Sequence, residues 1–337
     1  MTTAAVVGTG YWGRNHVRTL LALRNEGLFD RLVIVEPNPT QAAAMVEEFG
    51  VEAIPFSDLP AHGVTMATVA TPTGTHLDLA VHLMHMGIDV LVEKPIAMDA
   101  AQAEVMLHEA QATGQLLLVG HVFRHHAAVR HARTMIEGGV IGPVRQIITE
   151  RMSSRAPRDD NGVIAALGIH DLDICCDLLG DVEPETITGM ASPSVVDGIE
   201  DHAALQMRFP SLDGEPGAVA YITLSWRSRI RGKVRDLHII GRDGSLSIDY
   251  LDHGGLWLHR HPGEAHGPEW GGFDAAPRER VEIPLGEPAL TAELRDFILR
   301  STGQIEGPAL NDANVGLRGL QRVEDALRAT GFAHQVA

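Results

Sequence analysis

The 337-residue sequence contains few cysteines, few aromatic side chains and no long apolar run. Its only cysteines, Cys175 and Cys176, are adjacent, and because neighbouring cysteines rarely bridge each other we expect no disulfide framework. No stretch of about 18 apolar residues occurs, which argues against a membrane-spanning helix. The first residues enter an apolar run without a basic region before it, so no secretory signal is expected. These absences predict a cytoplasmic protein in a reducing compartment.

Positive charge is also scarce. Lys and Arg together number 27 against 44 Asp and Glu, so the formal net charge is −17. Nucleic acids and anionic membranes are bound through clustered cations, and we therefore expect neither as a partner. The hydrophobic content of 45% and the charged content of 21% are typical of a globular protein. Since a single domain usually has about 150 residues, the length favours two domains.

Short apolar runs alternate with amphipathic stretches over residues 1–120. Strands that are apolar throughout and separated by helices of about ten residues are typical of a parallel sheet with helices on both faces. We therefore predict a doubly wound α/β (Rossmann) domain over 1–120, with strands at 4–7, 31–36, 65–70, 89–93 and 116–120.

The pattern changes after Gly120. Most apolar runs beyond residue 185 are strand-like and are joined by turn pairs such as Asp243–Gly244, which predicts a largely antiparallel sheet. Residues 121–337 are therefore expected to form an α+β domain. Its predicted strands are 143–152, 202–209, 218–226, 235–240, 245–250 and 256–261, its helices 125–137, 169–179, 291–301 and 311–329, and its loops 153–161 and 262–276.

A glycine-rich segment follows the first predicted strand. Residues 8–13 fit the pattern G-x-G-x-x-G: the first glycine permits a tight turn, the second allows a pyrophosphate to approach the backbone, and the third lets helix and strand pack closely. The helix that begins there presents unpaired amides to the phosphates. We predict a dinucleotide site that includes Gly8, Gly10, Tyr11, Trp12 and Gly13.

An acidic residue stands at the end of the second predicted strand. Glu36 follows Gly13 by 23 residues, where a carboxylate accepts hydrogen bonds from the adenosine ribose and repels a 2′-phosphate. This position favours NAD over NADP. Arg14 leaves NADP open as the less favoured alternative, because a nearby arginine can accommodate the extra phosphate.

The fourth predicted strand ends in Glu93–Lys94–Pro95. Open α/β sheets bind their ligands at the carboxyl edge, where Lys94 is expected to lie. A partly desolvated lysine near a cationic nicotinamide should have a depressed pKa, which suits a general base near neutral pH. On position alone, a surface lysine that ends a strand explains Lys94 equally well.

Several segments together resemble one family. The glycine loop, ATPTGTH at 70–76, EKP at 93–95, VGHVFR at 119–124 and GIHD at 168–171 occur in that order. They look like the glucose–fructose oxidoreductase / inositol dehydrogenase (Gfo/Idh/MocA) family, and the pattern is closest to its UDP-N-acetylglucosamine 3-dehydrogenase-like members. The resemblance implies an NAD(P)-dependent oxidoreductase of a sugar, sugar nucleotide or cyclitol. It also implies that residues 121–337 bind the substrate and support oligomerisation, with an open-faced sheet that forms the interface of a homodimer or homotetramer.

The resemblance also assigns site residues by matching position. Lys94 would be the acid/base group and would contact both cofactor and substrate, and His170 would orient the substrate hydroxyl. The remaining cofactor-binding residues that it implies are Thr71, Pro72, Thr73, His76 and Glu93, and the substrate-binding candidates are Arg124 and Asn161. Arg124 could bind a substrate hydroxyl or phosphate, or it could be a solvated arginine at the start of a helix.

One expected carboxylate is missing. Many family members carry an aspartate four residues before the histidine that His170 matches, and here that residue is Ala166. Three explanations stay open. Either the Lys94–His170 pair is sufficient, or another carboxylate (Asp160, Asp171 or Asp173) replaces the aspartate, or the protein binds ligand without turnover.

The 18 histidines do not form a clear metal motif. His121 and His125 are four residues apart, as ligands on one helix face would be, but no acidic or cysteine ligand accompanies them. No metal is expected there or around His259. The resulting prediction is an NAD-dependent dehydrogenase of an amino sugar or nucleotide sugar that oxidises a secondary alcohol, with C3 oxidation one option. The alternatives are a cyclitol dehydrogenase and a non-catalytic dinucleotide- or sugar-binding protein.

Overall fold

The computed structural model describes residues 2–154, 161–212, 214–230, 232–252, 255–260, 278–283 and 286–333. The chain divides into two compact units, Met1–His125 with Glu287–Gln321 and His126–Gly286 with Arg322–Ala337. The predicted domain ranges differ from this division mainly at 287–321, which folds against the first unit. Among the described residues, no helix has the length and apolar character needed to cross a membrane.

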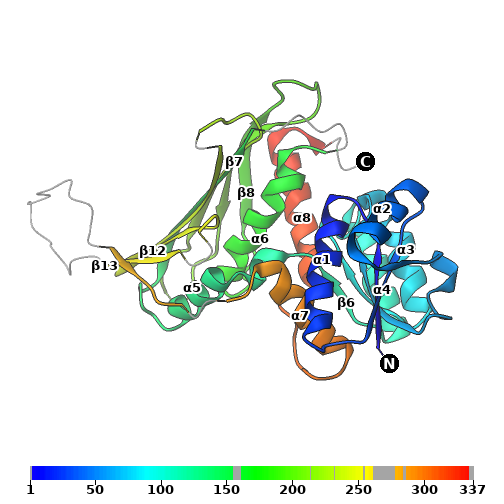
Figure 1. The fold of residues 1–337 in the computed structure, drawn as a ribbon. Helices are drawn as coiled ribbons and strands as arrows, with labels where there is room; N and C mark the ends of the chain where they lie inside the picture. Colours follow the sequence, from blue (N-terminus) through cyan, green and yellow to red (C-terminus); the bar gives the residue numbers. More distant parts are fainter. Residues whose placement is uncertain are drawn as a thin grey trace, which may run out of the picture. The chain divides into compact units, whose positions relative to one another are not determined.

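The first unit is built on a six-stranded parallel sheet (Figure 1). The strand order is β3–β2–β1–β4–β5–β6, so the order reverses direction beside β1, where open sheets of this kind bind ligands. The predicted parallel sheet is confirmed. The strands are β1 (Thr3–Val7), β2 (Arg31–Val35), β3 (Glu52–Ala53), β4 (Val64–Val69), β5 (Asp89–Val92) and β6 (Leu117–Val119).

Helices cover both faces of this sheet because its strands are apolar on both sides. Ala4 and Val6 of β1 join one core with the helices α1, α2 and α7, whereas Ala5 and Val7 join another core with α3 and α4. The doubly wound architecture is thereby confirmed. The helices are α1 (Tyr11–Asn25), α2 (Pro39–Phe49), α3 (His76–His85), α4 (Ala100–Thr113) and α7 (Ala289–Ser301).

The ends of two helices follow directly from local sequence. The side chain of Asn38 caps α2 by accepting hydrogen bonds from two first-turn amides, and the side chain of Asp99 caps α4 by accepting one from the Gln102 amide. Gly50 and Gly114 end these helices in the left-handed conformation, with φ of 63° and 73°. Local sequence therefore determines where both helices begin and end.

The second unit contains an eight-stranded sheet of order β14–β13–β12–β11–β7–β10–β9–β8. Only β7 and β10 pair in parallel, so the predicted, largely antiparallel sheet is confirmed. The strands are β7 (Val144–Ser153), β8 (Thr186–Ser192), β9 (His202–Arg208), β10 (Val219–Ser225), β11 (Lys233–Gly241), β12 (Gly244–Asp249), β13 (Leu256–Arg260) and β14 (Arg278–Arg280). The helices are α5 (Ala127–Glu137), α6 (Ile169–Leu178) and α8 (Ala313–Thr330), which begins in the first unit.

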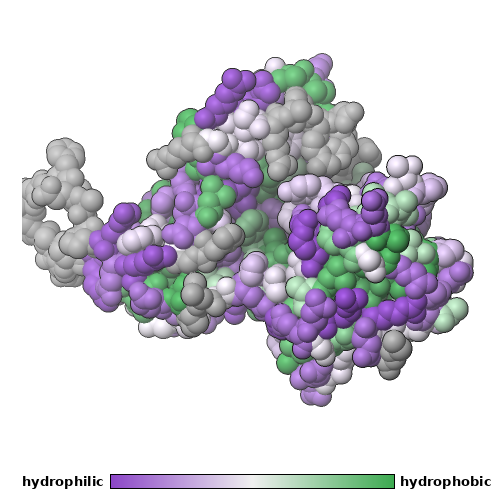
Figure 2. All heavy atoms as spheres, in the orientation of Figure 1, coloured by the Kyte–Doolittle hydropathy of each residue, from purple (hydrophilic) through white to green (hydrophobic). Residues whose placement is uncertain are grey.

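The two faces of this sheet differ. Helices α5 and α6 lie on one face, toward which Leu224 of β10 points, close to Gly168 at the start of α6. The opposite face exposes apolar side chains such as Met190 (81% exposed) and Tyr221 (41%). Across the visible surface of each unit, hydrophobic and hydrophilic residues are interspersed (Figure 2). The two-faced pattern is typical of a sheet with one covered side.

Strand β8 is an element that the sequence pattern did not predict. Its segment is interrupted by Gly189, which weakens a strand signal. In the sheet, a Cβ at this position would lie 2.5 Å from the carbonyl oxygen of Ala204 on β9. The glycine therefore permits close approach of the neighbouring strand.

A buried polar contact fixes the returning segment 287–321 on the first unit. The Asn311 side chain donates hydrogen bonds to the Val119 carbonyl (2.7 Å) and to Oε1 of Glu293 (3.1 Å), and Glu293 is 1% exposed. Burial, together with the negative charge of Glu93, raises the pKa of Glu293 well above its ordinary value. The helix α7 is thus held beside the end of β6 by a carboxyl group that favours its neutral form.

This raised pKa predicts a specific pH dependence of stability. A carboxyl whose folded pKa exceeds its unfolded pKa stabilises the fold below the unfolded value, and that contribution is lost as the pH rises through the folded pKa. The free energy of unfolding should fall as the pH rises above the ordinary carboxyl pKa, by on the order of 1 kcal/mol per pH unit, and we expect Glu293→Gln to remove this part of the fall. Urea unfolding from about pH 4 to 9 measures it. The exposed Glu306→Gln serves as control, and equal pH slopes for wild type and Glu293→Gln would contradict the prediction.

Candidate active site

The glycine loop has the geometry that a dinucleotide requires. Gly8 has φ of +86°, and a Cβ there would lie 2.5 Å from the Thr71 side chain. A Cβ on Gly13 would lie 2.0 Å from the Gly8 carbonyl oxygen, so only glycine fits at either position. At Gly10 nothing lies within 4 Å, which leaves the backbone open to a ligand.

The start of α1 completes this loop. Gly10 is the N-cap residue and provides no side-chain hydrogen bond to the first-turn amides, which therefore present donors and a partial positive charge to an anion. Tyr11 and Trp12 are 78% and 41% exposed and stack edge to face, with ring centroids 5.8 Å apart. The residues present thus fit a bound pyrophosphate.

Glu36 lies immediately after β2, beside the glycine loop. Its Oε2 accepts hydrogen bonds from the backbone amide (2.9 Å) and the hydroxyl (2.8 Å) of Thr9, and its Oε1 accepts one from the Asn38 amide (3.0 Å). Arg14, which could have accommodated a 2′-phosphate, forms an ion pair with Glu48. The loop therefore carries a fixed negative charge where a dinucleotide would place its ribose hydroxyls.

Glu93 and Lys94 follow the end of β5. Glu93 is 8% exposed; its Oε1 lies 3.0 Å from Nε2 of His16 on α1, and its Oε2 accepts a hydrogen bond from the Lys94 amide (3.1 Å). Burial alone would raise the pKa of the Glu93 carboxyl, but the hydrogen bond from His16 and the charges of His16 and Lys94 outweigh it and lower the pKa. A charged carboxylate thus fixes the backbone that carries Lys94.

Space for the Glu93 carboxylate depends on the neighbouring strand. A Cβ on Gly120, just after β6, would lie 3.1 Å from Oε2 of Glu93. Gly120 therefore leaves space for the buried carboxylate of Glu93. A larger residue at 120 would press on the group that holds Lys94.

His76 links two of the predicted cofactor segments. Its Nδ1 lies 2.9 Å from the Pro95 carbonyl oxygen and its Nε2 lies 3.0 Å from that of Thr71, and the side chain is 1% exposed. Burial lowers the pKa of His76. The imidazole thereby ties the segment of Thr71, Pro72 and Thr73 to the segment after Lys94, which is a positioning contact that the sequence did not foresee.

Arg124 is buried in the first unit rather than solvated. It is 2% exposed, and Nη1 donates a hydrogen bond to the Leu310 carbonyl (3.1 Å) of the returning segment. The neighbouring His121 and His125 are also buried. Within the described ranges, no three His, Cys, Asp or Glu side chains gather as a metal site would require.

His170 lies in the first turn of α6 in the second unit and is 7% exposed. The next residue, Asp171, forms a buried bidentate ion pair with Arg151 of β7, with distances of 2.7 and 3.0 Å. Asp173 lies 3.5 Å from Arg322. Both carboxylates therefore have arginine partners, which gives each a structural role in holding the helix that carries His170.

Ala166 lies in a short π-helical turn, Ile164–Gly168, just before α6. A carboxylate does approach this turn from elsewhere in the chain: Oε1 of Glu200, which is fully buried, accepts a hydrogen bond from the Ile164 amide (2.9 Å). A Cβ on Gly162 would lie 1.7 Å from Oε2 of Glu200, so the glycine makes room for it. Sequence reasoning missed Glu200, because nothing local links it to Ala166.

Of the remaining residues considered in the sequence, the structure describes Asn161, Cys175 and Cys176. Asn161 has a buried Oδ1 without a hydrogen-bond partner among the described residues. Asp160, most of the loop 153–161 and the loop 262–276 lie outside the described residues. Cys175 and Cys176 are free and buried.

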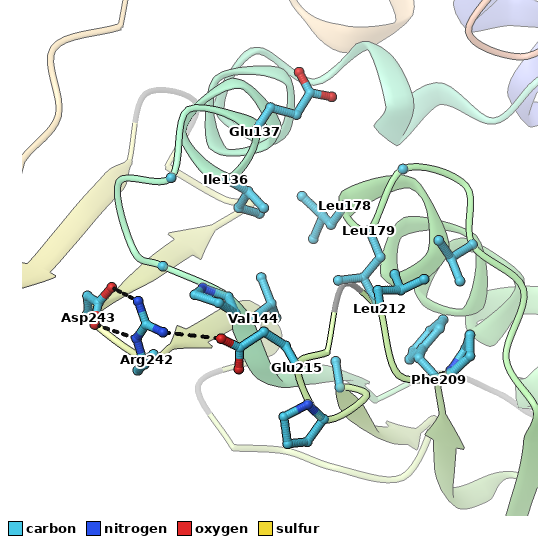
Figure 3. Close-up of a pocket in the computed structure, with 18 residues that line it drawn as sticks. Ile136, Glu137, Val144, Leu178, Leu179, Phe209, Leu212, Glu215, Arg242 and Asp243 are labelled. Carbon is cyan, nitrogen blue, oxygen red and sulfur yellow. Dashed lines mark hydrogen bonds and ion pairs between the residues drawn. The ribbon is translucent and has the colours of Figure 1, made fainter.

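A pocket in the second unit does not coincide with these residues. It has a volume of about 570 Å³ and lies at the start of β7 and the end of α6, whereas His170 lies at the start of α6. Figure 3 shows apolar side chains such as Leu178 and Ile136 around it, with Arg242 bonded to Asp243 and Glu215. The charge of Arg242 is thus already balanced by Asp243 and Glu215. None of the predicted site residues lines this pocket.

Comparisons with known proteins agree with this geometry. A family model described as an oxidoreductase family with an NAD-binding Rossmann fold matches residues 2–121, and the Gfo/Idh/MocA C-terminal domain matches residues 129–247. The UDP-N-acetylglucosamine 3-dehydrogenase of Acidithiobacillus ferrooxidans is 30% identical over 295 residues, which are 87% of this chain and 86% of that protein. The scyllo-inositol 2-dehydrogenase (NAD(+)) of Bacillus subtilis is 26% identical over 258 residues, 74% of each chain.

A solved structure extends the similarity to the whole chain. The UDP-N-acetylglucosamine 3-dehydrogenase structure from Acidithiobacillus ferrooxidans matches with a TM-score of 0.83 at 27% identity, covering 99% of both chains. The chain therefore shares its fold with this relative.

The negative charge of Glu36 leads to a prediction about the preference of the protein for NAD over NADP. We expect Glu36→Gln, which keeps the side-chain shape and removes the charge, to lower the ratio of NADH to NADPH affinity about tenfold, since a hydrogen bond to a charged group contributes about 1.5–3 kcal/mol. Fluorescence titration of both reduced cofactors measures the ratio without any knowledge of the substrate. Glu47→Gln, an exposed acid on α2, is the matched control. Tighter binding of NADPH than of NADH by the wild-type protein would refute the assignment.

Proposed function

The chain belongs to the Gfo/Idh/MocA family of oxidoreductases, and on this premise we propose that it oxidises a secondary alcohol of a sugar-like substrate with NAD⁺, or reduces the corresponding ketone. Its first domain is an NAD-binding Rossmann domain. The observation that carries the proposal is the position of Lys94, which follows β5 and is held by the buried contact of Glu93 with His16.

Lys94 supplies the acid/base function in this proposal. When bound, NAD⁺ supplies the hydride acceptor. Nζ of Lys94 removes the proton from the substrate hydroxyl during oxidation and returns it during reduction. His170, by its position in the motif, binds the same hydroxyl and orients it. The chain therefore contributes orientation and proton transfer, and the buried Glu93 keeps the lysine backbone in place.

NAD is favoured over NADP. Glu36 places a negative charge beside the glycine loop, and Arg14, the cation next to that loop, is paired with Glu48. A 2′-phosphate would meet the carboxylate without a free arginine to neutralise it.

Among substrates, we favour an amino sugar or a nucleotide sugar with oxidation at C3. The support is the 30% identity over 87% of the chain to a protein named as a UDP-N-acetylglucosamine 3-dehydrogenase. A cyclitol is the second candidate, because an inositol 2-dehydrogenase of Rhizobium meliloti is 25% identical over 98% of both chains. Ala166 supports a third, a protein that binds sugar and cofactor without turnover.

The exposed face of the second sheet is proposed as the contact between copies of this chain. Met190 and Tyr221 expose apolar surface there, beside a hollow of about 510 Å³ that includes Met152 and Thr223. A homodimer or homotetramer would bury these side chains.

Substitution of one side chain on this face tests the assembly. We expect Tyr221→Asp to reduce the mass in solution from that of an oligomer to that of a monomer, because burying an unpaired charge opposes association. Light scattering after size exclusion measures the mass. Val105→Asp, which changes an exposed apolar side chain of α4 in the first unit, is the control, and an unchanged mass for Tyr221→Asp would reject this face as the interface.

The catalytic proposal is tested by NADH formation at 340 nm with a panel of amino sugars, UDP-sugars and cyclitols. We expect Lys94→Ala to lower kcat at least 100-fold on the active substrate, since a positioned general base contributes about 10²–10⁴-fold. NADH affinity should stay within about threefold of wild type, which shows that the fold is intact. A Lys94→Ala variant with wild-type kcat would exclude this role.

The same panel distinguishes the alternatives. A wild-type protein that binds sugar and NAD⁺ but forms no NADH with any member is a non-catalytic binder. Turnover of cyclitols in preference to sugars would select the second candidate instead.

A further inference from the structure

The carboxylate of Glu93 lies against the backbone of Lys94. Its Oε2 is 3.1 Å from the Lys94 amide nitrogen. A fully extended lysine side chain spans roughly 6 Å from Cα to Nζ, so Nζ lies within about 11 Å of that oxygen in every rotamer. At this separation in a partly buried site, a negative charge favours the protonated amine by the equivalent of about one pH unit. The charge of Glu93 therefore acts directly on the group to which we assign proton transfer.

The side chain of His16 stabilises the charged form of Glu93. His16 lies on α1 with 0% exposure, and its Nε2 is 3.0 Å from Oε1 of Glu93. Because the charged carboxylate is the acceptor, Nε2 carries the hydrogen of this bond in either protonation state of the ring. Burial is the largest influence on the pKa of Glu93 and raises it, so without this donor the carboxyl would favour its neutral form. The contact with His16 thus maintains a negative charge beside Lys94.

Two other titratable groups interact with the charge of Glu93, and neither replaces the donor of His16. They are His76, at the start of α3, and Glu293 on α7. Burial lowers the pKa of His76, and both of its ring nitrogens already face backbone carbonyl oxygens, at 2.9 and 3.0 Å. Burial raises the pKa of Glu293 well above its ordinary value and favours the neutral carboxyl. Neither group therefore brings a positive charge to Glu93 near neutral pH.

A negative charge at this place suits the role assigned to Lys94. The residue is half-buried, and both desolvation and a nearby nicotinamide cation lower the pKa of an amine. An amine whose pKa falls far below the working pH is a weak base for a hydroxyl proton. The carboxylate of Glu93 opposes this decrease and keeps the pKa of Lys94 closer to neutral pH.

We propose that His16 is a positioning residue that acts through the Glu93 carboxylate and thereby sets the pH at which Lys94 exchanges its proton. The proposal rests on the proposed function in giving Lys94 the proton-transfer role, whereas the coupling from α1 to the Lys94 amine is a property of the folded first unit. Removal of either the His16 donor or the Glu93 charge therefore makes Lys94 lose its proton at a lower pH.

The amine of Lys94 can be titrated without a substrate, because the sequence contains only two lysines, Lys94 and Lys233. Trace acetylation of the full-length protein over a series of pH values, followed by mass spectrometry of the two lysine peptides, gives the pKa of each amine. We expect Glu93→Gln to lower the pKa of Lys94 by about one pH unit, which is a tenfold rise in its acid dissociation constant. His16→Leu should lower the pKa of Lys94 as well. The double variant should lower it no further than Glu93→Gln alone, because His16 acts through Glu93.

Two further variants separate this coupling from a general disturbance of the fold. His16→Gln keeps an N–H donor near the position of Nε2 and should return the pKa of Lys94 to within about 0.3 pH unit of the wild-type value. His85→Leu removes a matched contact between a histidine and a glutamate, 2.8 Å from Nε2 to Oε2 of Glu109, at the C-terminal end of α3. It should leave the pKa of Lys94 unchanged. Lys233, which is exposed in the second unit, is the internal reference for reactivity toward the reagent.

A kinetic measurement connects the titration to turnover. With the active substrate of the sugar panel, the acid limb of kcat/KM against pH reports the pKa of the essential base in the free enzyme. This limb should move to lower pH in Glu93→Gln and His16→Leu by the same amount as the pKa of Lys94, and His16→Gln should restore it.

The outcomes separate this coupling from the proposed function. An unchanged pKa of Lys94 in both Glu93→Gln and His16→Leu overturns the coupling, even if the wild type forms NADH. Additive decreases in the double variant contradict an action of His16 through Glu93. If His16→Leu does not fold, a decrease in His16→Gln equal to that in Glu93→Gln overturns the role of the His16 donor. The expected decreases, without NADH formation by the wild type on any substrate, support the coupling and reject the dehydrogenase function.

Discussion

The buried contact between Glu93 and His16 is the interaction on which the site of the first unit depends. A carboxylate that is only 8% exposed is costly unless it is paired, and here it accepts from His16 on α1 and from the Lys94 amide. Because α1 begins at the glycine loop, this contact connects that loop to the strand end that carries Lys94. The two segments to which we assign cofactor binding and proton transfer therefore share one rigid frame.

The surroundings of that contact are arranged to tolerate it. Gly120 leaves space for the carboxylate, and His76 fixes the backbone on the far side of Lys94 through the Pro95 carbonyl. The neutral form of Glu293, favoured by its raised pKa, avoids a second negative charge near Glu93. Glu36, to which we assign the choice of cofactor, lies beside the glycine loop, where it accepts hydrogen bonds from Thr9.

The sequence predicted those features that local patterns determine. The apolar strands and the glycine loop of the first unit were found because each depends on neighbouring residues, and Lys94 was found because it follows a buried strand. Features that depend on distant contacts were not found. The return of 287–321 to the first unit, the tether made by His76 and the approach of Glu200 to the turn of Ala166 join residues far apart in the chain. Strand β8 was missed because Gly189 interrupts its pattern while serving close strand packing.

The central claim is that the Lys94 amine performs the proton transfer, and chemical rescue tests it most directly. A Lys94→Ala protein leaves room for a small primary amine at the end of β5, within the frame held by Glu93 and His16. The account predicts that added alkylamines restore NADH formation, with a rate that rises with amine concentration and follows amine basicity after correction for size. Rates that do not respond to any amine, although NADH and sugar still bind, would contradict it.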